Sequence, residues 1–296
     1  MILYPNCKIN LGLHVVGRRA DGYHNIETIF LPIPLADCLE IEPSHEDEFT
    51  MDGRPLDCED VDNLVVMVVR LLRNEGYDVP PVAIRLTKNI PSGAGLGGGS
   101  TDAAFMMKAL NQLFELGMTS VQMQLLVRRL GADCPVFIDN VPVFAEGIGD
   151  VFHELSAEMV QKTYCMLPPV GAMLPPTQTL TMPRNLVGYW LVLVKPDEFI
   201  STAEAYKNVH PRSSEYHLPD IFMRSVRQWK GRMVNDFEES VFPMHPVVEG
   251  IRDQMYMLGA HYSAMSGSGS TVFGLFPNKP ILGNVFADHF LWQVEL

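Results

Sequence analysis

Apolar and polar residues alternate through much of the first third of the chain, and this two-residue period is typical of β-strands. The alternation predicts strands at 2–8, 11–16, 26–30, 38–42 and 82–87. The pair Asp21-Gly22 predicts a turn between two of these strands, because both residues tolerate the backbone angles of tight turns. The first part of the chain is therefore expected to consist mainly of short strands.

Other stretches repeat their apolar residues at the helical period. One helix is expected at 63–74, where Asn63 can cap the N-terminus and Gly76 follows the end. Gly131 is expected to form a left-handed cap after another helix. Strands and helices mixed without strict alternation indicate the α+β class. The remaining predicted elements are helices at 100–114, 120–130, 218–230 and 246–258, and strands at 188–195, 262–265 and 272–276.

One stretch between these elements has little periodicity. Residues 157–185 are rich in Pro, Thr and Met, with paired prolines at 168–169 and 175–176. Pro and Thr clusters between periodic segments are typical of loops. We therefore expect a long loop or a mobile insertion here, at a domain boundary.

Composition narrows the class of protein. The chain has 296 residues, 47% hydrophobic and 19% charged, so it can form one large or two modest globular domains. Its net charge of −13 argues against nucleic acid or an acidic membrane surface as a partner. No apolar run reaches membrane-spanning length and the N-terminus is a poor signal peptide, which predicts a cytoplasmic protein. The cysteines form no CxxC or metal-binding spacing, so free thiols are expected in a reducing compartment at Cys7, Cys38, Cys58, Cys134 and Cys165.

The densest glycine cluster lies at 91–101, between a predicted strand and a predicted helix. Five of its eleven residues are glycine. Because glycine is costly to order, such a cluster in a folded domain needs a reason. Backbone N–H groups beside a helix N-terminus favour an anion, most often a phosphate. The cluster therefore predicts phosphate binding in preference to a flexible linker.

The common nucleotide-binding loops fit this cluster poorly. Gly93, Gly95 and Gly98 match GxGxxG, but Pro91 and its neighbours separate the preceding strand from the glycines. A dinucleotide fold needs the strand to enter the loop directly. A P-loop needs Lys where Gly99 stands, and the glycine loop of protein kinases lies between two strands.

Three further clusters change this picture, namely Lys8-Ile9-Asn10 with 20–24, the segment 130–137, and the late run 266–270. Together with 91–101 they resemble the GHMP kinase family of small-molecule kinases. The resemblance implies a two-domain α+β fold, with a ribosomal-protein-S5-like N-terminal domain, a C-terminal α/β-sandwich domain and the active site in the cleft between them. It places the domains at 1–155 and 188–296, with 156–187 as a Pro-rich insertion or loop.

The resemblance also implies roles for individual residues. Asp133 would be the general base and Lys8 its partner, which keeps the carboxylate ionised. The cofactors would be ATP and Mg²⁺, with the hydroxyl of Ser100 or Thr101 at a phosphate or the magnesium ion. Asn63, Leu64 and Lys88 would lie near the adenine. The expected phosphate loop comprises Pro91, Gly93, Gly95, Leu96, Gly97, Gly98, Gly99, Ser100 and Thr101.

The segments 8–11 and 19–24 narrow the resemblance to family members whose substrate is a cytidine-diphosphate-linked sugar alcohol. Such a kinase phosphorylates the 2-hydroxyl of that substrate in the non-mevalonate isoprenoid pathway. Asn10 would hold the reacting hydroxyl, Tyr23 would stack on the cytosine, and His24 would hydrogen-bond to it. Phe30 and Tyr206 are candidate further walls of the cytidine site. Two alternatives stay open, another family kinase acting on mevalonate, homoserine or a sugar, and a non-catalytic binding protein with this fold; either a monomer or a homodimer fits the sequence.

Overall fold

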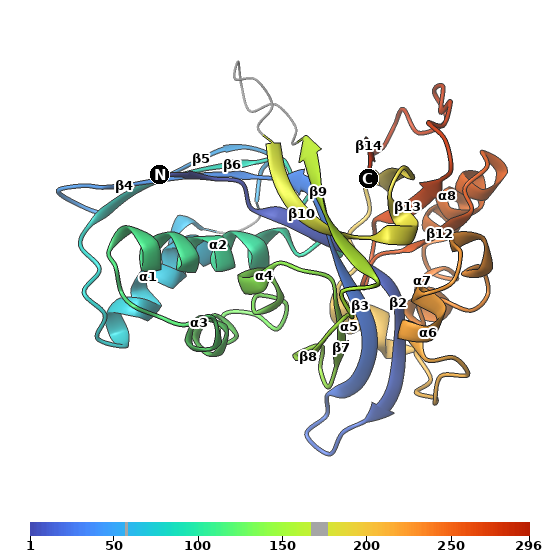
Figure 1. Ribbon diagram of the computed structural model, residues 1–296, viewed down its shortest axis with the longest axis horizontal. Coiled ribbons are helices and arrows are strands. Elements are labelled where there is room, and N and C mark those ends of the chain that lie inside the picture. Colours follow the sequence, from blue (N-terminus) through green and yellow to red (C-terminus); the bar gives the residue numbers. More distant parts are fainter. Residues whose placement is uncertain (57–58, 167–176) are drawn as a thin grey trace.

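The computed structural model describes residues 1–56, 59–166 and 177–296. Two lobes lie on either side of a long β-hairpin (Figure 1). The hairpin consists of β2 (Asn6–Arg18) and β3 (His24–Ala36), and β7 (Val143–Glu146) and β8 (Val151–Glu154) extend it to the antiparallel sheet β2-β3-β7-β8. The predicted strand 11–16 and the end of the predicted strand 2–8 are thus one strand, whereas Ile2–Leu3 belong to another sheet. The pairing of β2 with β3 shifts between Leu11 and Leu13, on either side of Gly12.

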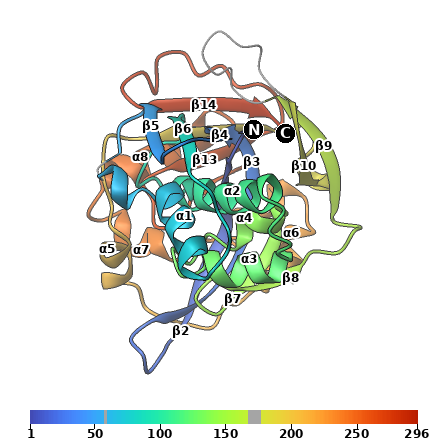
Figure 2. The ribbon, with the colours of Figure 1, turned by 90° about the vertical axis from the view of Figure 1, so that its left-hand side faces the viewer.

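The first lobe is a second sheet covered by helices. Its strand order is β1-β4-β6-β5, and β5 and β6 are parallel. Figure 2 shows the four helices α1–α4 gathered together beside this sheet. The elements are β1 (Ile2–Leu3), β4 (Cys38–Pro43), β5 (Glu48–Gly53), η1 (Asp60–Asp62), α1 (Leu64–Asn74), β6 (Val82–Lys88), α2 (Gly98–Leu113), α3 (Ser120–Val127) and α4 (Val136–Asp139).

The helix ends of this lobe test the cap predictions. Asn63 caps α1, because its Oδ1 accepts the N–H of Val65 at 3.1 Å, and Gly76 adopts a φ of +85° after the helix. The cap predicted at Gly131 is wrong, since α3 ends at Val127 and Gly131 has no positive φ. A glycine is needed there for space, because a Cβ would lie 3.1 Å from the sulfur of Cys134.

The loop predicted at 157–185 is wrong for the residues that the structure describes. β9 (Val160–Met166) and β10 (Thr177–Pro183) pair as an antiparallel hairpin, in which Val160 faces Pro183. β10 lies against β3, and Leu180 and Met182 enter the core. The alternation of Thr179 and Thr181 with these two apolar residues is the strand signal, which the prolines of the segment obscured.

The second lobe is the antiparallel sheet β12-β13-β11-β14, with α8 packed on β12 and β13. The helix predicted at 218–230 is broken, because the carbonyls of Phe222 and Arg224 accept the side-chain amide of Asn185 instead of helical N–H groups. The elements are η2 (Arg184–Leu186), β11 (Trp190–Lys195), α5 (Thr202–Lys207), α6 (Leu218–Phe222), η3 (Val226–Gln228), α7 (Phe237–Val241), α8 (Pro246–Met257), β12 (Tyr262–Met265), β13 (Val272–Phe276) and β14 (Phe290–Glu295).

One hydrophobic core joins the β2–β3 hairpin to the second lobe. Ile9 and Leu11 of β2 pack in the same buried cluster as Leu191 and Phe273 of the second lobe. Because β-strand residues point alternately to opposite faces, this burial turns Lys8 and Asn10 toward the other face of β2. The α+β prediction is confirmed. No helix of the described residues is long and apolar enough to cross a membrane.

The structure describes four of the five cysteines that were predicted to be free thiols. Cys7, Cys38, Cys134 and Cys165 are buried free thiols, whereas Cys58 lies outside the described residues. Burial raises the pKa of the Cys134 thiol to about 11, so this thiol is protonated and unreactive at neutral pH. The prediction of free thiols is confirmed at these four positions.

A buried carboxyl in α7 gives the fold a pH dependence. Glu238 accepts the N–H of Met265 at 2.7 Å and lies 3.7 Å from a guanidinium nitrogen of Arg252. Burial raises the pKa of Glu238 to about 7, above its ordinary value of 4.5. The folded protein therefore binds a proton here more tightly than the unfolded chain does, and the stability from that proton is lost as the pH rises through 7.

We expect the substitution Glu238→Gln to become more stabilising as the pH rises. The amide keeps an oxygen for the N–H of Met265, and it does not carry the buried negative charge that the parent acquires. Between pH 5 and pH 8 the difference in unfolding free energy should move in favour of the variant by about 2 kcal/mol. Urea denaturation of both proteins at the two pH values measures this shift, and a difference independent of pH would contradict it.

Candidate active site

A cavity of about 1000 Å³ lies where the β2–β3 hairpin, the glycine loop and the second lobe meet. Its wall includes Lys8, Asn10, Asp133 and most of the glycine loop, so the structure brings together residues that are distant in the sequence. A cavity of this size is in the range of sites for nucleotides and other small molecules.

Lys8 is at the centre of the polar part of this wall. Its side chain is 3% exposed, and its ammonium nitrogen lies 3.4 Å from Oδ2 of Asp133. The same nitrogen donates to Oδ1 of Asn10 at 2.7 Å and to the carbonyl of Gly95 at 3.0 Å. The ring of Phe30 lies below it, with its centroid 5.3 Å away. The buried ammonium is therefore compensated by one carboxylate and two neutral acceptors.

Asp133 lies in the short connection between α3 and α4. A hydrogen bond from the N–H of Cys134 to the carbonyl of Gly131 closes this connection at 3.2 Å. The Asp133 side chain is 36% exposed, so it faces the cavity while it pairs with Lys8. Burial, together with the negative charge of Asp133, raises the pKa of Tyr206 to about 12. The phenol of Tyr206 is therefore protonated at neutral pH and can donate a hydrogen bond.

The glycine loop is a series of left-handed turns that leads into α2. Gly93, Gly95 and Gly97 have φ angles of +55°, +71° and +71°. Gly97 caps α2, and Gly98 and Gly99 form its first turn beside the cavity. N–H groups of a first helical turn have no partner within the helix, and the helix dipole adds positive potential there. The cavity thus has an anion-binding wall at this helix end.

Lys88 does not present a free ammonium to this cavity. It donates to Asp37 and, at 2.6 Å, to Asp102 of α2, and all three side chains are buried. Burial alone would lower the pKa of Lys88, but the two carboxylates raise it above its usual range. Asp37 also accepts the N–H groups of Asn89 and Ile90. The ion cluster fixes both ends of the glycine loop. Lys88 lines the cavity while its amine is held by the two carboxylates, and its contact with adenine stays a prediction.

Three expected contact residues are not part of the cavity lining. Asn63 is buried as the cap of α1, and Leu96 packs in the core while its carbonyl accepts the N–H of Lys8 at 3.0 Å. Thr101 is fully buried, and its hydroxyl has no hydrogen-bond partner among the described residues. Ser100 and Leu64 do line the cavity. Of the two candidate hydroxyls, that of Ser100 is therefore the one placed to meet a ligand.

An aromatic wall forms another part of the cavity lining. The rings of His24 and Tyr206 stack with centroids 4.7 Å apart and an interplanar angle of 16°. Phe237 packs edge-on against Tyr206 at 4.7 Å. Tyr23 is 63% exposed at the rim. Phe30 borders the cavity but is buried, with its ring under Lys8.

The second glycine turn, Ser266–Ser270, is a further part of the cavity wall and contacts the glycine loop. The hydroxyl of Ser266 donates to the carbonyl of Gly95 at 3.0 Å and accepts the N–H of Asn10 at 3.2 Å. A Cβ on Gly95 would lie 2.0 Å from the carbonyl oxygen of Ser266, which is too close for any side chain. The two glycine turns thus touch directly, backbone against backbone.

The residues before α5 are a part of the wall that the sequence did not predict. Phe199 is 74% exposed beside Gly93, and Ile200 and Ser201 continue the lining. His245 holds this segment through hydrogen bonds to Glu198 at 2.5 Å and Glu204 at 3.1 Å. No motif marks these residues; the only available signal is an apolar Phe-Ile pair that follows a buried strand after Pro196 and two acidic residues.

Comparison with known proteins places the chain in a family. The models for the GHMP kinases N terminal domain and the GHMP kinases C terminal domain match residues 63–147 and 222–287. A 4-diphosphocytidyl-2-C-methyl-D-erythritol kinase of Parabacteroides distasonis is 47% identical over the full length of both chains. One of Bacteroides fragilis is 45% identical, also over the full length of both.

Solved structures agree with this placement. The crystal structure of a 4-(cytidine 5'-diphospho)-2C-methyl-D-erythritol kinase has a TM-score of 0.74 and 30% identity, covering 99% of this chain and 98% of the other. A mevalonate kinase, with a TM-score of 0.68 and 15% identity over 99% of this chain and 98% of its own, shares the fold. The chain therefore belongs to the GHMP kinase family, in the group of the 4-diphosphocytidyl-2-C-methyl-D-erythritol kinases.

Proposed function

We propose that this cavity transfers the γ-phosphoryl group of ATP to the 2-hydroxyl of 4-diphosphocytidyl-2-C-methyl-D-erythritol, a step of the non-mevalonate isoprenoid pathway. The names of the full-length relatives support this reaction. The observation that carries the proposal is the ion pair of Lys8 with the half-exposed Asp133, 3.4 Å apart in the cavity that the N-terminus of α2 lines. A carboxylate and an anion site in one cavity are what phosphoryl transfer to an alcohol requires.

Asp133 acts as the general base in this reaction. Its carboxylate accepts the proton of the substrate hydroxyl while the hydroxyl oxygen bonds to the γ-phosphorus of ATP. The bond between that phosphorus and the β–γ bridging oxygen breaks, and ADP leaves with that oxygen. A positioned base is typically worth about a hundred- to ten-thousandfold in rate.

Lys8 and Asn10 position the reacting groups. Both side chains are buried, and the hydrogen bond between them fixes the ammonium beside Asp133. The positive charge attracts the Asp133 carboxylate and stabilises negative charge that develops on the transferred group. The amide of Asn10 donates to Thr28 at 2.9 Å, which leaves its oxygen directed to Lys8.

The phosphates of ATP bind at the N-terminus of α2. Gly97, Gly98 and Gly99 offer backbone N–H groups, and Ser100 adds a hydroxyl. Among the described residues no group of three His, Cys, Asp or Glu side chains could hold a metal ion. We therefore infer that Mg²⁺ enters with the phosphates and meets the Ser100 hydroxyl. When bound there, it neutralises part of the phosphate charge.

The aromatic wall takes the cytidine of the acceptor. The stacked pair of His24 and Tyr206, with Tyr23 at the rim, offers flat faces and polar edges to a base. Mevalonate and homoserine carry no base, so this wall favours the cytidine substrate over the acceptors of related kinases. The Lys8–Asp133 pair likewise favours an enzyme over a binding protein that keeps only the fold.

A coupled ADP-release assay tests the reaction. The purified protein is supplied with ATP, Mg²⁺ and one acceptor at a time, namely the cytidine substrate, mevalonate or homoserine. We expect turnover with the cytidine substrate alone. Efficient turnover of mevalonate or homoserine without turnover of the cytidine substrate would overturn the proposal.

We expect His24→Ala to raise the KM for the cytidine substrate about tenfold, because a base–aromatic contact is worth about 1–3 kcal/mol. The KM for ATP should change little, since His24 stacks on Tyr206 in the aromatic wall and is not part of the glycine loop. His45→Ala is the control, because this exposed histidine lies far from the cavity wall. An equal rise in the KM for ATP would contradict the assigned role.

We infer the cellular compartment of the protein from the state of its thiols. The four described cysteines are free and buried, which supports our inference of a reducing compartment such as the cytoplasm. The choice between a monomer and a homodimer stays a prediction, which sedimentation analysis of the purified protein decides. The domain limits at 155 and 188 are likewise proposed.

A further inference from the structure

Asn235, in the segment before α7, holds the second glycine turn by its side chain. This residue is 3% exposed, and its amide nitrogen donates to the carbonyls of Met265 and Gly267, each at 2.8 Å. Its Oδ1 accepts the N–H of Phe237 at 3.0 Å. An asparagine amide has two N–H donors, so both donors are used on the two carbonyls of one turn.

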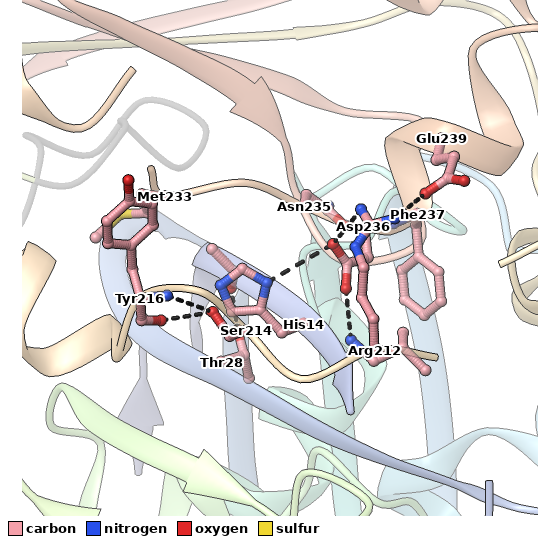
Figure 3. Close-up of polar contacts among 12 residues, drawn as sticks. His14, Thr28, Arg212, Ser214, Tyr216, Met233, Asn235, Asp236, Phe237 and Glu239 are labelled. Carbon is pink, nitrogen blue, oxygen red and sulfur yellow. Dashed lines mark hydrogen bonds and ion pairs between the residues drawn. The ribbon is translucent and has the colours of Figure 1, made fainter. Parts of the chain in front are cut away.

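The segment that carries Asn235 is fixed to β2. The N–H of Leu13 donates to the carbonyl of Val234 at 2.8 Å, and the N–H of Asp236 donates to the carbonyl of Leu13 at 2.7 Å. Figure 3 shows Asp236 between His14 and Arg212, with Asn235 and Phe237 on either side of it in the chain. Asp236 also accepts the N–H of Val15 at 2.8 Å. The base of the Asn235 side chain is therefore anchored to the same strand that carries Lys8 and Asn10.

The turn held by Asn235 fixes two backbone groups near Lys8, the carbonyl of Gly95 and the N–H of Asn10. Ser266 lies between Met265 and Gly267, the two residues that the amide binds. Its hydroxyl contacts the carbonyl of Gly95 and the N–H of Asn10. The carbonyl of Gly95 is in turn an acceptor for the ammonium of Lys8. A displacement of the turn would therefore alter the groups that orient Lys8.

The other contact of Asn235 leads to the aromatic wall. By accepting the N–H of Phe237, its oxygen fixes the start of α7, where the ring of Phe237 packs against Tyr206. Tyr206 stacks on His24. One side-chain amide thus links the turn beside the phosphate loop to the wall assigned to the acceptor.

We propose that Asn235 is a positioning residue for phosphoryl transfer, which holds the Ser266–Ser270 turn at the distance from β2 and Phe237 that the reaction requires. The inference rests on the function proposed above. It assigns no contact with either substrate to Asn235, because this residue is absent from the cavity wall. Its loss should therefore lower kcat more than it raises either KM.

The substitution Asn235→Asp tests this role, because it keeps the shape of the side chain and removes both donors. A carboxylate would face the carbonyl oxygens of Met265 and Gly267, and the turn would move away. Misplacement of about 1 Å costs about a hundredfold in rate. We expect kcat to fall by about 10- to 100-fold, with the KM for each substrate within about threefold of the parent.

Asn185→Asp is the matched control. Asn185 uses the same donors on two carbonyls, those of Phe222 at 2.7 Å and Arg224 at 3.0 Å. This clamp lies outside the cavity wall. Both variants lose two hydrogen bonds of one amide and should melt at lower temperature than the parent. Only the Asn235 variant should lose kcat at a temperature where all three proteins are folded.

The pH dependence of the ratio of variant to parent kcat separates positioning from a general loss of stability. A protonated carboxyl can donate again to one carbonyl, so the ratio should rise as the pH falls from 8 to 6. The nearest titratable and charged groups are Glu238 on the N–H of Met265, Asp236 with His14 and Arg212, and Lys8 with Asp133. Glu238 has a pKa raised to about 7 and contacts Met265, so the double variant Glu238→Gln, Asn235→Asp is compared with Glu238→Gln alone, and the same rise of the ratio at low pH is expected without the Glu238 titration.

The outcomes are distinct. If the parent turns over the cytidine substrate and the Asn235 variant loses kcat with a ratio that recovers at low pH, the positioning role is supported. If the Asn235 and Asn185 variants show equal kcat, or the ratio is independent of pH, the positioning role is overturned. If the parent itself is inactive toward every acceptor tested, the proposed function fails, irrespective of Asn235.

Discussion

Replacement of Asp133 by Asn is expected to lower kcat by about a hundred- to ten-thousandfold, the range typical of a positioned base. The amide keeps the size of the side chain and can still accept a hydrogen bond from Lys8, but it cannot take the proton of the attacking hydroxyl at neutral pH. Asp133 is 36% exposed, but the substitution leaves the buried Lys8 ammonium with neutral acceptors alone, so the variant should also be less stable than the parent, and rates are compared at a temperature where both proteins are folded. Initial rates measured under saturating concentrations of both substrates report the change.

The affinity for ATP distinguishes the loss of the general base from a general loss of structure. The glycine loop and the first turn of α2 do not depend on Asp133 for any hydrogen bond between described residues, so the Kd for ATP should stay within about threefold. Asp139→Asn is the control, because this exposed carboxylate lies on α4, outside the cavity wall, and hydrogen-bonds to Gln124. Activity in the Asp133 variant equal to that of the control would show that the base is another group.

The parts of the site that the sequence predicted well are those whose chemistry is local. The glycine run 91–101 lies directly before α2, so its anion-binding character follows from neighbouring residues alone. Lys8 and Asp133 were paired only through the resemblance to a family, since nothing local joins two residues so far apart. The family is now confirmed, and the structure places the two side chains in contact.

Tertiary contacts explain where sequence reasoning failed. The family resemblance implied Lys88 as an adenine contact and gave no sign of its partners, because Asp37 and Asp102 reach its ammonium only through the fold. The strand β10 was hidden because prolines suggested a loop, although β3 gives its apolar face a core to enter. Asn235 has no motif at all, and only the path of the chain places it beside Met265 and Gly267.

The contact between the two glycine turns predicts the effect of Gly95→Ala. Gly95 has a φ of +71°, where an added methyl group costs about 1–2 kcal/mol in any surroundings. Here the methyl group would also lie 2.0 Å from the carbonyl oxygen of Ser266. Because that oxygen belongs to the backbone, it cannot rotate away, and one of the turns must shift.

Gly76→Ala introduces the backbone strain without the clash, so it separates these two costs. Gly76 has a φ of +85°, and no atom of the described residues lies within 4 Å of its ideal Cβ. Both variants should unfold at lower urea concentration than the parent, through the shared backbone strain. Only Gly95→Ala should lose kcat, by about a hundredfold, since the carbonyl of Gly95 that receives the Lys8 ammonium moves with the turn. If both variants kept the parent's kcat, the contact between the turns would be irrelevant to the reaction, and the positioning of Lys8 would have to come from Asn10 alone.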